Sequence, residues 1–216
     1  MDTNITRALG GQLDAIKETL KAIKAGTFSA SQKRTVKQTL CAQHDNRYAQ
    51  GIYAVYLLKT EKYTEATPLL KRIANYRCDT QENQALELLK TNAQYNLGVM
   101  YDSGLYIEQS DQKAFECFLL AAKRGHATAQ FNIGNMYHNK QYVKQNYKQA
   151  FKYFSLAAER YCTAALYNLG VMYYKGEYVE KDLQKAFEYF SLAARQGHKN
   201  AQIVLELMRK QGVQPE

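Results

Sequence analysis

The sequence predicts an all-α fold, a solenoid of stacked helix–turn–helix repeats, and two observations lead to this. The first is a register of 36 residues that recurs without insertion in the second half of the chain, as in Ala93, Ala129, Ala165 and Ala201. The second is composition, because a chain of 216 residues with only two prolines suits helices. A fixed period of this length is typical of helical hairpins that bury their apolar faces only by stacking.

The same 36-residue step joins residues of several other kinds. The triplets are Asn96, Asn132 and Asn168; Leu97, Ile133 and Leu169; Gly98, Gly134 and Gly170; and Tyr101, Tyr137 and Tyr173. A register kept through three units is unlikely by chance. The glycines are most simply explained as positions of close helix packing, and the repeat as a whole indicates a recognition surface more than a catalytic pocket.

The first part of the chain, residues 1–45, is predicted to be a helical segment. Its apolar residues Leu9, Leu13, Ile16, Leu20 and Ile23 recur at steps of three and four, which is the mark of an amphipathic helix over 2–25. A second helix is expected over 31–45.

Residues 46–90 are predicted to form a degenerate helical repeat. In its hairpin over 46–77 the apolar residues of the first helix would be Ile52, Val55, Tyr56 and Leu57, and those of the second helix would be Ala66, Leu69, Leu70 and Ile73. Pro68 is expected within about the first turn of the second helix, where a missing N–H costs little. One long helix is expected over 81–103.

Residues 91–210 are predicted to hold three regular 36-residue repeats, near 91–126, 127–162 and 163–198, followed by a C-terminal capping helix. Residues 211–216 are expected to be a tail. Each repeat has a first helix, as in 92–103, a loop, and a second helix, as in 111–123. Ser110, Asn146 and Asp182 share one repeat position and are good N-cap residues, so they mark where the second helices begin.

The repeats resemble Sel1-like repeats, relatives of the tetratricopeptide repeat. The residues that carry the resemblance in the third unit are Ala165, Leu169, Gly170, Tyr173, Gly176, Val179, Asp182, Lys185, Ala186, Tyr189, Phe190, Ala193, Ala194 and Gly197. The resemblance implies a right-handed α-solenoid. Proteins of this kind usually act as adaptors or scaffolds, often in bacteria, in signalling, secretion or host interaction.

The middle unit departs from the family pattern, since Lys140 replaces the loop glycine and Tyr161 the final glycine. All three units carry a tyrosine, Tyr106, Tyr142 or Tyr178, where the family usually has a second loop glycine. We therefore expect that loop to differ in detail from the family norm. Cysteine-rich relatives bridge the two helices of a unit with a disulfide, but this chain lacks the paired cysteines.

The cysteines and histidines give no indication of a metal site, a cofactor or a catalytic site, so we expect no cofactor and no enzymatic activity. The cysteines, Cys41, Cys78, Cys117 and Cys162, include no C-x-x-C pair, so buried free thiols are favoured over disulfides. None of the histidines, His44, His126, His138 and His198, has metal-ligand spacing or lies beside a candidate nucleophile with an orienting acid.

Charge and hydropathy limit the partners further. The net charge of +9 is spread along the chain, which modestly favours an acidic partner but falls short of the clustering typical of nucleic-acid binding. No apolar run is long enough for a membrane helix. The N-terminus shows no secretory signal, so a cytoplasmic location is expected if the chain starts at its native methionine; a secreted effector is the alternative.

Helical geometry predicts the partner-binding residues. At 100° per residue, Tyr95, Val99 and Asp102 point away from the core stripe that starts at Ala93. With their repeat mates they form what we call the first-helix strip: Tyr95, Val99, Asp102, Phe131, Asn135, His138, Tyr167, Val171 and Tyr174. Asn96, Asn132 and Asn168 flank it as further candidates. First helices normally line the concave side of a solenoid, where ligands bind.

Two questions stay open at this stage. Tyr95, Phe131 and Tyr167 have an alternative role, packing against neighbouring helices, and the three asparagines have an alternative role in bonding backbone or an adjacent loop.

The favoured function is a non-catalytic scaffold that binds a protein or peptide. The alternatives are an immunity protein that neutralises a toxin, a secreted effector that binds host proteins, and an enzyme, for which residues 1–45 are too short. The oligomeric state is not predicted.

Overall fold

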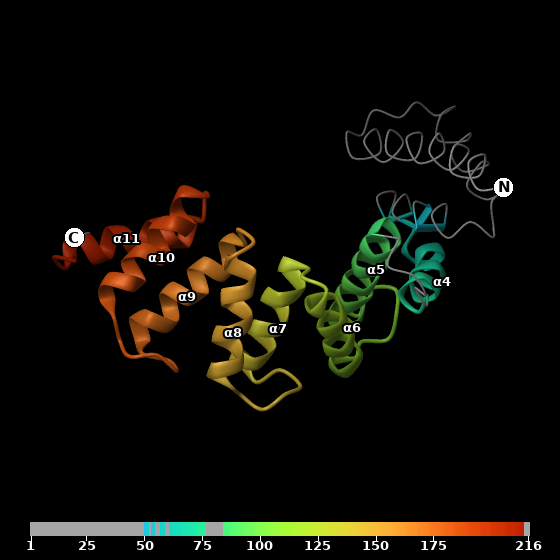
Figure 1. The fold of residues 1–216 in the computed structure, drawn as a ribbon, viewed down its shortest axis with the longest axis horizontal. Helices are drawn as coiled ribbons and strands as arrows, with labels where there is room; N and C mark the ends of the chain where they lie inside the picture. The colour runs from blue at the N-terminus through green and yellow to red at the C-terminus, as the bar shows by residue number, and fades with distance from the viewer. Residues whose placement is uncertain (1–49, 52, 55–56, 59–60, 77–83, 214–216) are drawn as a thin grey trace, which may run out of the picture. The chain divides into compact units, whose positions relative to one another are not determined.

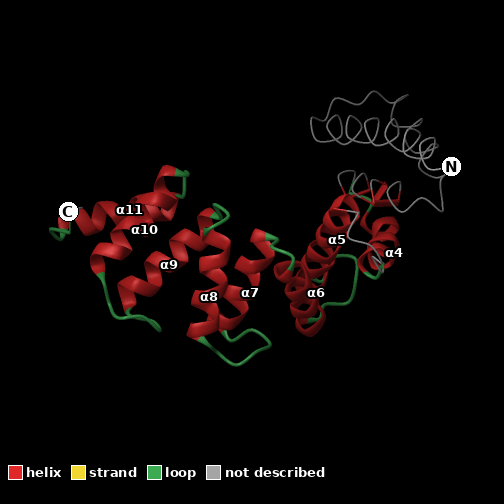
Figure 2. Cartoon of the chain, viewed as in Figure 1, coloured by secondary structure: helices red, strands yellow, loops and turns green. Residues whose placement is uncertain are grey.

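The computed structural model describes residues 50–51, 53–54, 57–58, 61–76 and 84–213. In this part of the chain every regular element is a helix, which confirms the predicted all-α fold (Figure 2). The chain divides into two compact units, Met1–Leu97 and Gly98–Glu216, called here the N-terminal and C-terminal units. The helices predicted over 2–25 and 31–45 lie outside the described residues.

The N-terminal unit contains α4 (Tyr63–Ala74) and most of α5 (Gln84–Ser103). The long helix predicted over 81–103 is confirmed from residue 84 onward. Leu57, Leu70 and Ile73 are buried as predicted, while Ile52, Val55 and Tyr56 lie outside the described residues.

The predicted place of Pro68 is wrong. The hydrogen-bond ladder of α4 begins with Ala66, whose N–H donates to the Lys62 carbonyl, so Pro68 lies in the second turn. Pro68 has no N–H to donate to the Thr64 carbonyl, and because Thr64 is exposed, water can bond to that carbonyl instead.

The C-terminal unit consists of helical pairs that repeat with the predicted period. Its helices are α6 (Asp111–Lys123), α7 (Ala127–Asn139), α8 (Tyr147–Ala158), α9 (Thr163–Lys175), α10 (Leu183–Arg195) and α11 (Lys199–Lys210). Within this unit, helices that follow one another in the chain pack against each other, from α6 to α11 (Figure 1). The first helices of the three repeats are the C-terminal part of α5, α7 and α9, the second helices are α6, α8 and α10, and α11 follows the last repeat.

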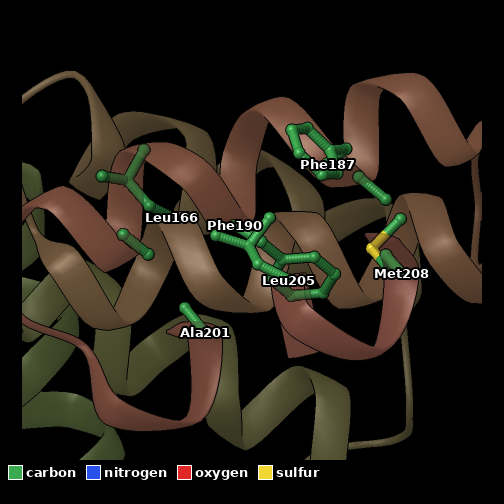
Figure 3. Close-up of a cluster of buried hydrophobic side chains, with 8 residues drawn as sticks. Leu166, Phe187, Phe190, Ala201, Leu205 and Met208 are labelled. Atoms are coloured by element: carbon green, nitrogen blue, oxygen red, sulfur yellow. The ribbon is translucent and has the colours of Figure 1, made fainter. Parts of the chain in front are cut away.

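The core of this unit is built from the same repeat positions in each pair. Ile133 and Leu169 are buried on the first helices, and Phe118, Phe154 and Phe190 are buried on the second helices. Figure 3 shows the last of these clusters, where Phe190 lies with Leu166, Phe187, Ala201, Leu205 and Met208. The burial confirms the helical register predicted from the sequence.

The repeated glycines of the first helices are close-packing positions, as predicted. A Cβ atom on Gly134 would lie 2.6 Å from the ring of Phe154, and one on Gly170 would lie 2.8 Å from Phe190. Only a bare backbone lets the buried phenylalanine of the second helix approach this closely.

The predicted N-caps of the second helices are confirmed. The side chains of Ser110, Asn146 and Asp182 accept hydrogen bonds from the backbone N–H three residues later, at 3.3, 3.0 and 2.9 Å. The bond from the Lys185 N–H is the main reason why the pKa of Asp182 lies below its usual value. These local contacts fix where each second helix begins.

The loop tyrosines adopt the left-handed backbone conformation that glycine favours, with φ of 65° at Tyr142 and 68° at Tyr178. Each of these rings packs on a phenylalanine of the preceding second helix. The ring centroids are 5.7 Å apart for Tyr142 and Phe115, and 5.6 Å apart for Tyr178 and Phe151. Contact between repeats therefore offsets the strain at these two loop positions.

Candidate partner-binding surface

The members of the first-helix strip differ in exposure, and Phe131, Tyr167 and Val171 pack partly against the buried core. In the C-terminal unit, Val99 and Tyr174 are each 37% exposed. The other members there, Asp102, Phe131, Asn135, His138, Tyr167 and Val171, are half-buried. Tyr95 and Asn96 belong to the N-terminal unit and are half-buried as well.

Two of the aromatic members serve packing, which was the alternative role considered for them. The ring of Phe131 lies 5.9 Å from that of Phe154. Tyr167 lies 5.5 Å from Phe190 and stacks on His198 at 4.4 Å. These rings support the helix pairs and keep only part of their surface for a partner.

The asparagines of the first helices bond across the repeats. Asn168 Nδ2 on α9 donates to Asn135 Oδ1 on α7, at 3.0 Å. This contact fixes both amides and favours a structural role for Asn168. Asn132 is half-buried on the same face.

A second polar contact between repeats occurs twice, and each time one of its partners is a residue of the first-helix strip. Asp102 Oδ1 accepts from Gln141 Nε2 at 2.9 Å, and His138 Nε2 lies 2.8 Å from Glu177 Oε2. Asp102 and His138 are 36 residues apart, as are Gln141 and Glu177, so this is one bridge used twice. It ties the ends of α5 and α7 to the loops of the repeats that follow them.

Tyr174 occupies the third copy of the Asp102 and His138 position, but it does not take part in such a bridge within the described residues. Its ring instead lies 5.8 Å from the Lys181 ammonium group. Because the equivalent residues are an aspartate and a histidine, packing at this position does not require an aromatic ring. The exposed ring is thus available to a partner.

The strip continues onto α11, which the sequence-based prediction missed. Ile203 and Leu207 are 58% and 53% exposed, and they lie 36 residues after Tyr167 and Val171. The sequence contains the information to predict this continuation, because the 36-residue spacing of the alanines extends to Ala201. Adding these two aliphatic side chains makes the C-terminal end of the strip its most apolar part.

The histidines expected in loops have a more specific role. Nδ1 of His126 accepts from the Ala129 N–H and Nδ1 of His198 from the Ala201 N–H, both at 3.2 Å, so they are N-caps of α7 and α11. Burial lowers the pKa of His126 below its usual value, against a smaller opposing effect of its own backbone hydrogen bond. The neutral ring is the form that can accept the capping bond.

The thiols and carboxylates of the described residues form no group of three or more that could hold a metal ion. Cys117 and Cys162 are free and half-buried, rather than buried as expected, and Cys41 and Cys78 lie outside the described residues. Burial, with a smaller effect of Glu116, raises the pKa of Cys117 to about 11. None of the described helices is both long and apolar enough to cross a bilayer.

The Sel1 repeat pattern matches this chain three times, over residues 91–126, 127–161 and 163–198. The chain belongs to the Sel1 repeat family. Sel1 repeat proteins generally mediate protein–protein interactions, and the family is typically a non-catalytic scaffold. No curated protein matches the chain.

Two solved structures support the assignment. A Sel1 repeat protein from Oxalobacter formigenes is 34% identical with a TM-score of 0.51, and the match covers 54% of this chain and 87% of that one. The protein c5321, described as a protective antigen present in uropathogenic Escherichia coli strains, displays an SLR fold and is 28% identical with a TM-score of 0.70. That match covers 85% of this chain and 37% of c5321.

Proposed function

We propose that this Sel1 repeat protein is a non-catalytic adaptor that binds a protein or peptide along the first-helix strip and its continuation on α11. The observation that carries the proposal is the exposure of apolar groups opposite the core, at Val99, Tyr174, Ile203 and Leu207. A group of exposed apolar side chains on one surface is typical of an interaction site. Aromatic and aliphatic anchors are the side chains that usually carry binding energy in protein interfaces.

The bridges between repeats favour binding by a preformed surface. The pairs Asn135–Asn168 and His138–Glu177 hold neighbouring first helices and loops in one arrangement. A partner that docks on Tyr174 or Val171 therefore meets side chains whose surroundings are already ordered. Less ordering on binding leaves more of the contact energy for affinity.

The biological setting of the adaptor is a separate question, because an immunity protein or a secreted effector would use the same physical surface. The +9 charge favours an acidic partner only modestly. The genes next to this one would distinguish the settings. A toxin gene would favour an immunity role, and a secretion cluster would favour an effector.

A crosslinking experiment tests the proposed surface. A photoreactive phenylalanine analogue is placed at position 174 or 207 of the full chain, in the native organism, and at the exposed position 148 on α8 as the matched control. We expect positions 174 and 207 to crosslink the same protein, and position 148 to give none of it. Crosslinks from position 148 alone, or equal yields from all three, would reject the strip as the binding surface.

A further inference from the structure

A second surface lies along the turns that join each second helix to the next first helix. These turns, 123–127, 159–163 and 195–199, are called here the turn edge. They are neighbours in space: a Cβ on Gly125 would lie 2.7 Å from Arg160 Nη2, and Thr163 Oγ1 donates to Gln196 Oε1 at 2.5 Å. The turn edge thus forms one continuous border of the C-terminal unit.

The turn edge carries charge of nearly one sign. Its exposed basic residues are Lys123, Arg124, Arg160, Arg195 and Lys199, and its acidic residue is Glu159. Arg124 donates to the Leu120 carbonyl at 3.2 Å. Within the described part of the chain the other four basic side chains form no ion pair. Whereas the charge of the whole chain is diffuse, here it is concentrated.

Tyr161 stands in the middle of this basic border and is unusual in two ways. Its side chain is 82% exposed, and its φ of 59° is a conformation that costs about 1–2 kcal/mol for a residue with a Cβ. Its repeat mates are Gly125 and Gly197, which adopt the same conformation without that cost.

Packing does not account for Tyr161. The strain at Tyr142 and Tyr178 is offset by ring contacts with Phe115 and Phe151, whereas Tyr161 makes no ring contact with any described residue. A strained and exposed residue without such a ring contact is a reason to look for a function.

We propose that the turn edge is a second docking surface, which binds an acidic segment of a protein partner, with Tyr161 as the ring contact and Arg160 and Arg195 as the carboxylate-binding groups. Guanidinium groups bind carboxylates through two parallel hydrogen bonds. A protein is favoured over a nucleic acid because Sel1 repeat proteins generally bind proteins. In addition, a single exposed ring on three turns gives no series of stacking platforms for bases.

Fluorescence anisotropy with defined peptides tests this proposal. The probe is a labelled 14-residue peptide of repeating Asp-Glu-Leu, and its control is the same peptide with Asn and Gln in place of Asp and Glu. The full chain should bind the acidic peptide at low salt and lose it as salt rises, because exposed charges are screened. The amide peptide should bind at least roughly tenfold more weakly, because its uncharged side chains cannot form charged pairs with the arginines.

Variants of the full chain assign the binding to the turn edge. The double variant Arg160→Gln/Arg195→Gln should weaken acidic-peptide binding about fivefold, as expected for two exposed ion pairs. Tyr161→Gly, which restores the residue found at both mates, should keep the fold and weaken binding about fivefold. The charge-matched control Lys144→Gln/Lys148→Gln changes two exposed lysines outside the three turns and should change binding less than about twofold.

Three outcomes would overturn the proposal. One is an equal loss in the lysine control, which would mean diffuse attraction by net charge. The second is unchanged binding in the arginine and tyrosine variants. The third is tighter binding of a single-stranded RNA 14-mer, or of phosphatidylserine vesicles, through the same residues. Tyr174→Ala should leave peptide binding unchanged, so this proposal and the proposed strip can fail independently.

Discussion

The ring of Phe190 on α10 packs directly against the backbone of Gly170 on α9, so closely that a Cβ at position 170 would lie 2.8 Å from the ring. The pair Phe154 and Gly134 repeats the contact one unit earlier, with 2.6 Å. Each repeat therefore joins its two helices through one bare backbone position and one buried ring. This contact is the structural reason for the glycine in the repeat.

Gly134→Ala should destabilise the fold by about 1–3 kcal/mol, since the added methyl group overpacks the contact with Phe154. Urea unfolding followed by circular dichroism measures the change. The double variant Gly134→Ala/Phe154→Leu should recover part of the loss, because the smaller side chain leaves space for the methyl group. An unchanged unfolding midpoint for Gly134→Ala would contradict the packing described here.

Lys140→Gly should stabilise the fold by about 1 kcal/mol, because Lys140 has a φ of 62° and glycine adopts that conformation without steric cost. Its repeat mates Gly104 and Gly176 already do so. Tyr142→Gly is the comparison: it relieves the same strain but loses the contact with Phe115, so its gain should be smaller or negative. If both glycines stabilised the protein equally, the ring contact would have no energetic value.

The sequence predicted the features of the fold that depend on residues near each other in the chain. The N-caps at Ser110, Asn146 and Asp182 need only the side chain and an N–H three residues away. The core register follows from helical periodicity alone. The left-handed Tyr142 could not be predicted in this way, because the ring that offsets its strain, Phe115, belongs to the preceding repeat.

The candidate site shows the same division. Angle around a helix is a local property, so the helical wheel could group Val99 with Tyr174, which are exposed, but it could not show that Tyr167 packs against the core. Whether Tyr167 faces a partner or packs on His198 depends on the start of α11, which lies beyond α10 in the chain. Ile203 and Leu207, in contrast, were predictable from the sequence, because they continue the 36-residue period of Tyr167 and Val171.

The stability of the protein should depend on the protonation of His126. Burial lowers the pKa of this histidine in the folded state. The unfolded state therefore takes up the proton first as the pH falls through about 6.5. The contribution of the neutral His126 to the free energy of unfolding is fully present above that pH and is lost progressively below it.

His126→Asn is the variant that isolates this effect, because asparagine is a good N-cap that does not titrate. Urea unfolding at pH 7.5 and pH 5 should show a smaller loss of stability in the variant than in the parent chain. Equal losses in the two proteins would place the pH dependence on other groups.

Cys117 should react slowly with alkylating reagents in the folded protein. Its pKa of about 11 leaves very little thiolate at pH 8, and the thiolate is the reactive form. In a variant with serine at the other three cysteine positions, mass spectrometry should show slow modification by iodoacetamide in buffer and rapid modification in urea. Equal rates in the two conditions would show that the Cys117 thiol is accessible and ordinary.

The most direct test of the central claim is the effect of Tyr174→Ala on affinity for the crosslinked partner, measured by calorimetry alongside the melting temperature. Tyr174 is on the exposed side of α9, and its mates Asp102 and His138 show that the position does not need a ring for packing. If the first-helix strip is the binding surface, Tyr174→Ala should cost at least about 2 kcal/mol of binding free energy and change the melting temperature little. A lower melting temperature with unchanged affinity would contradict it.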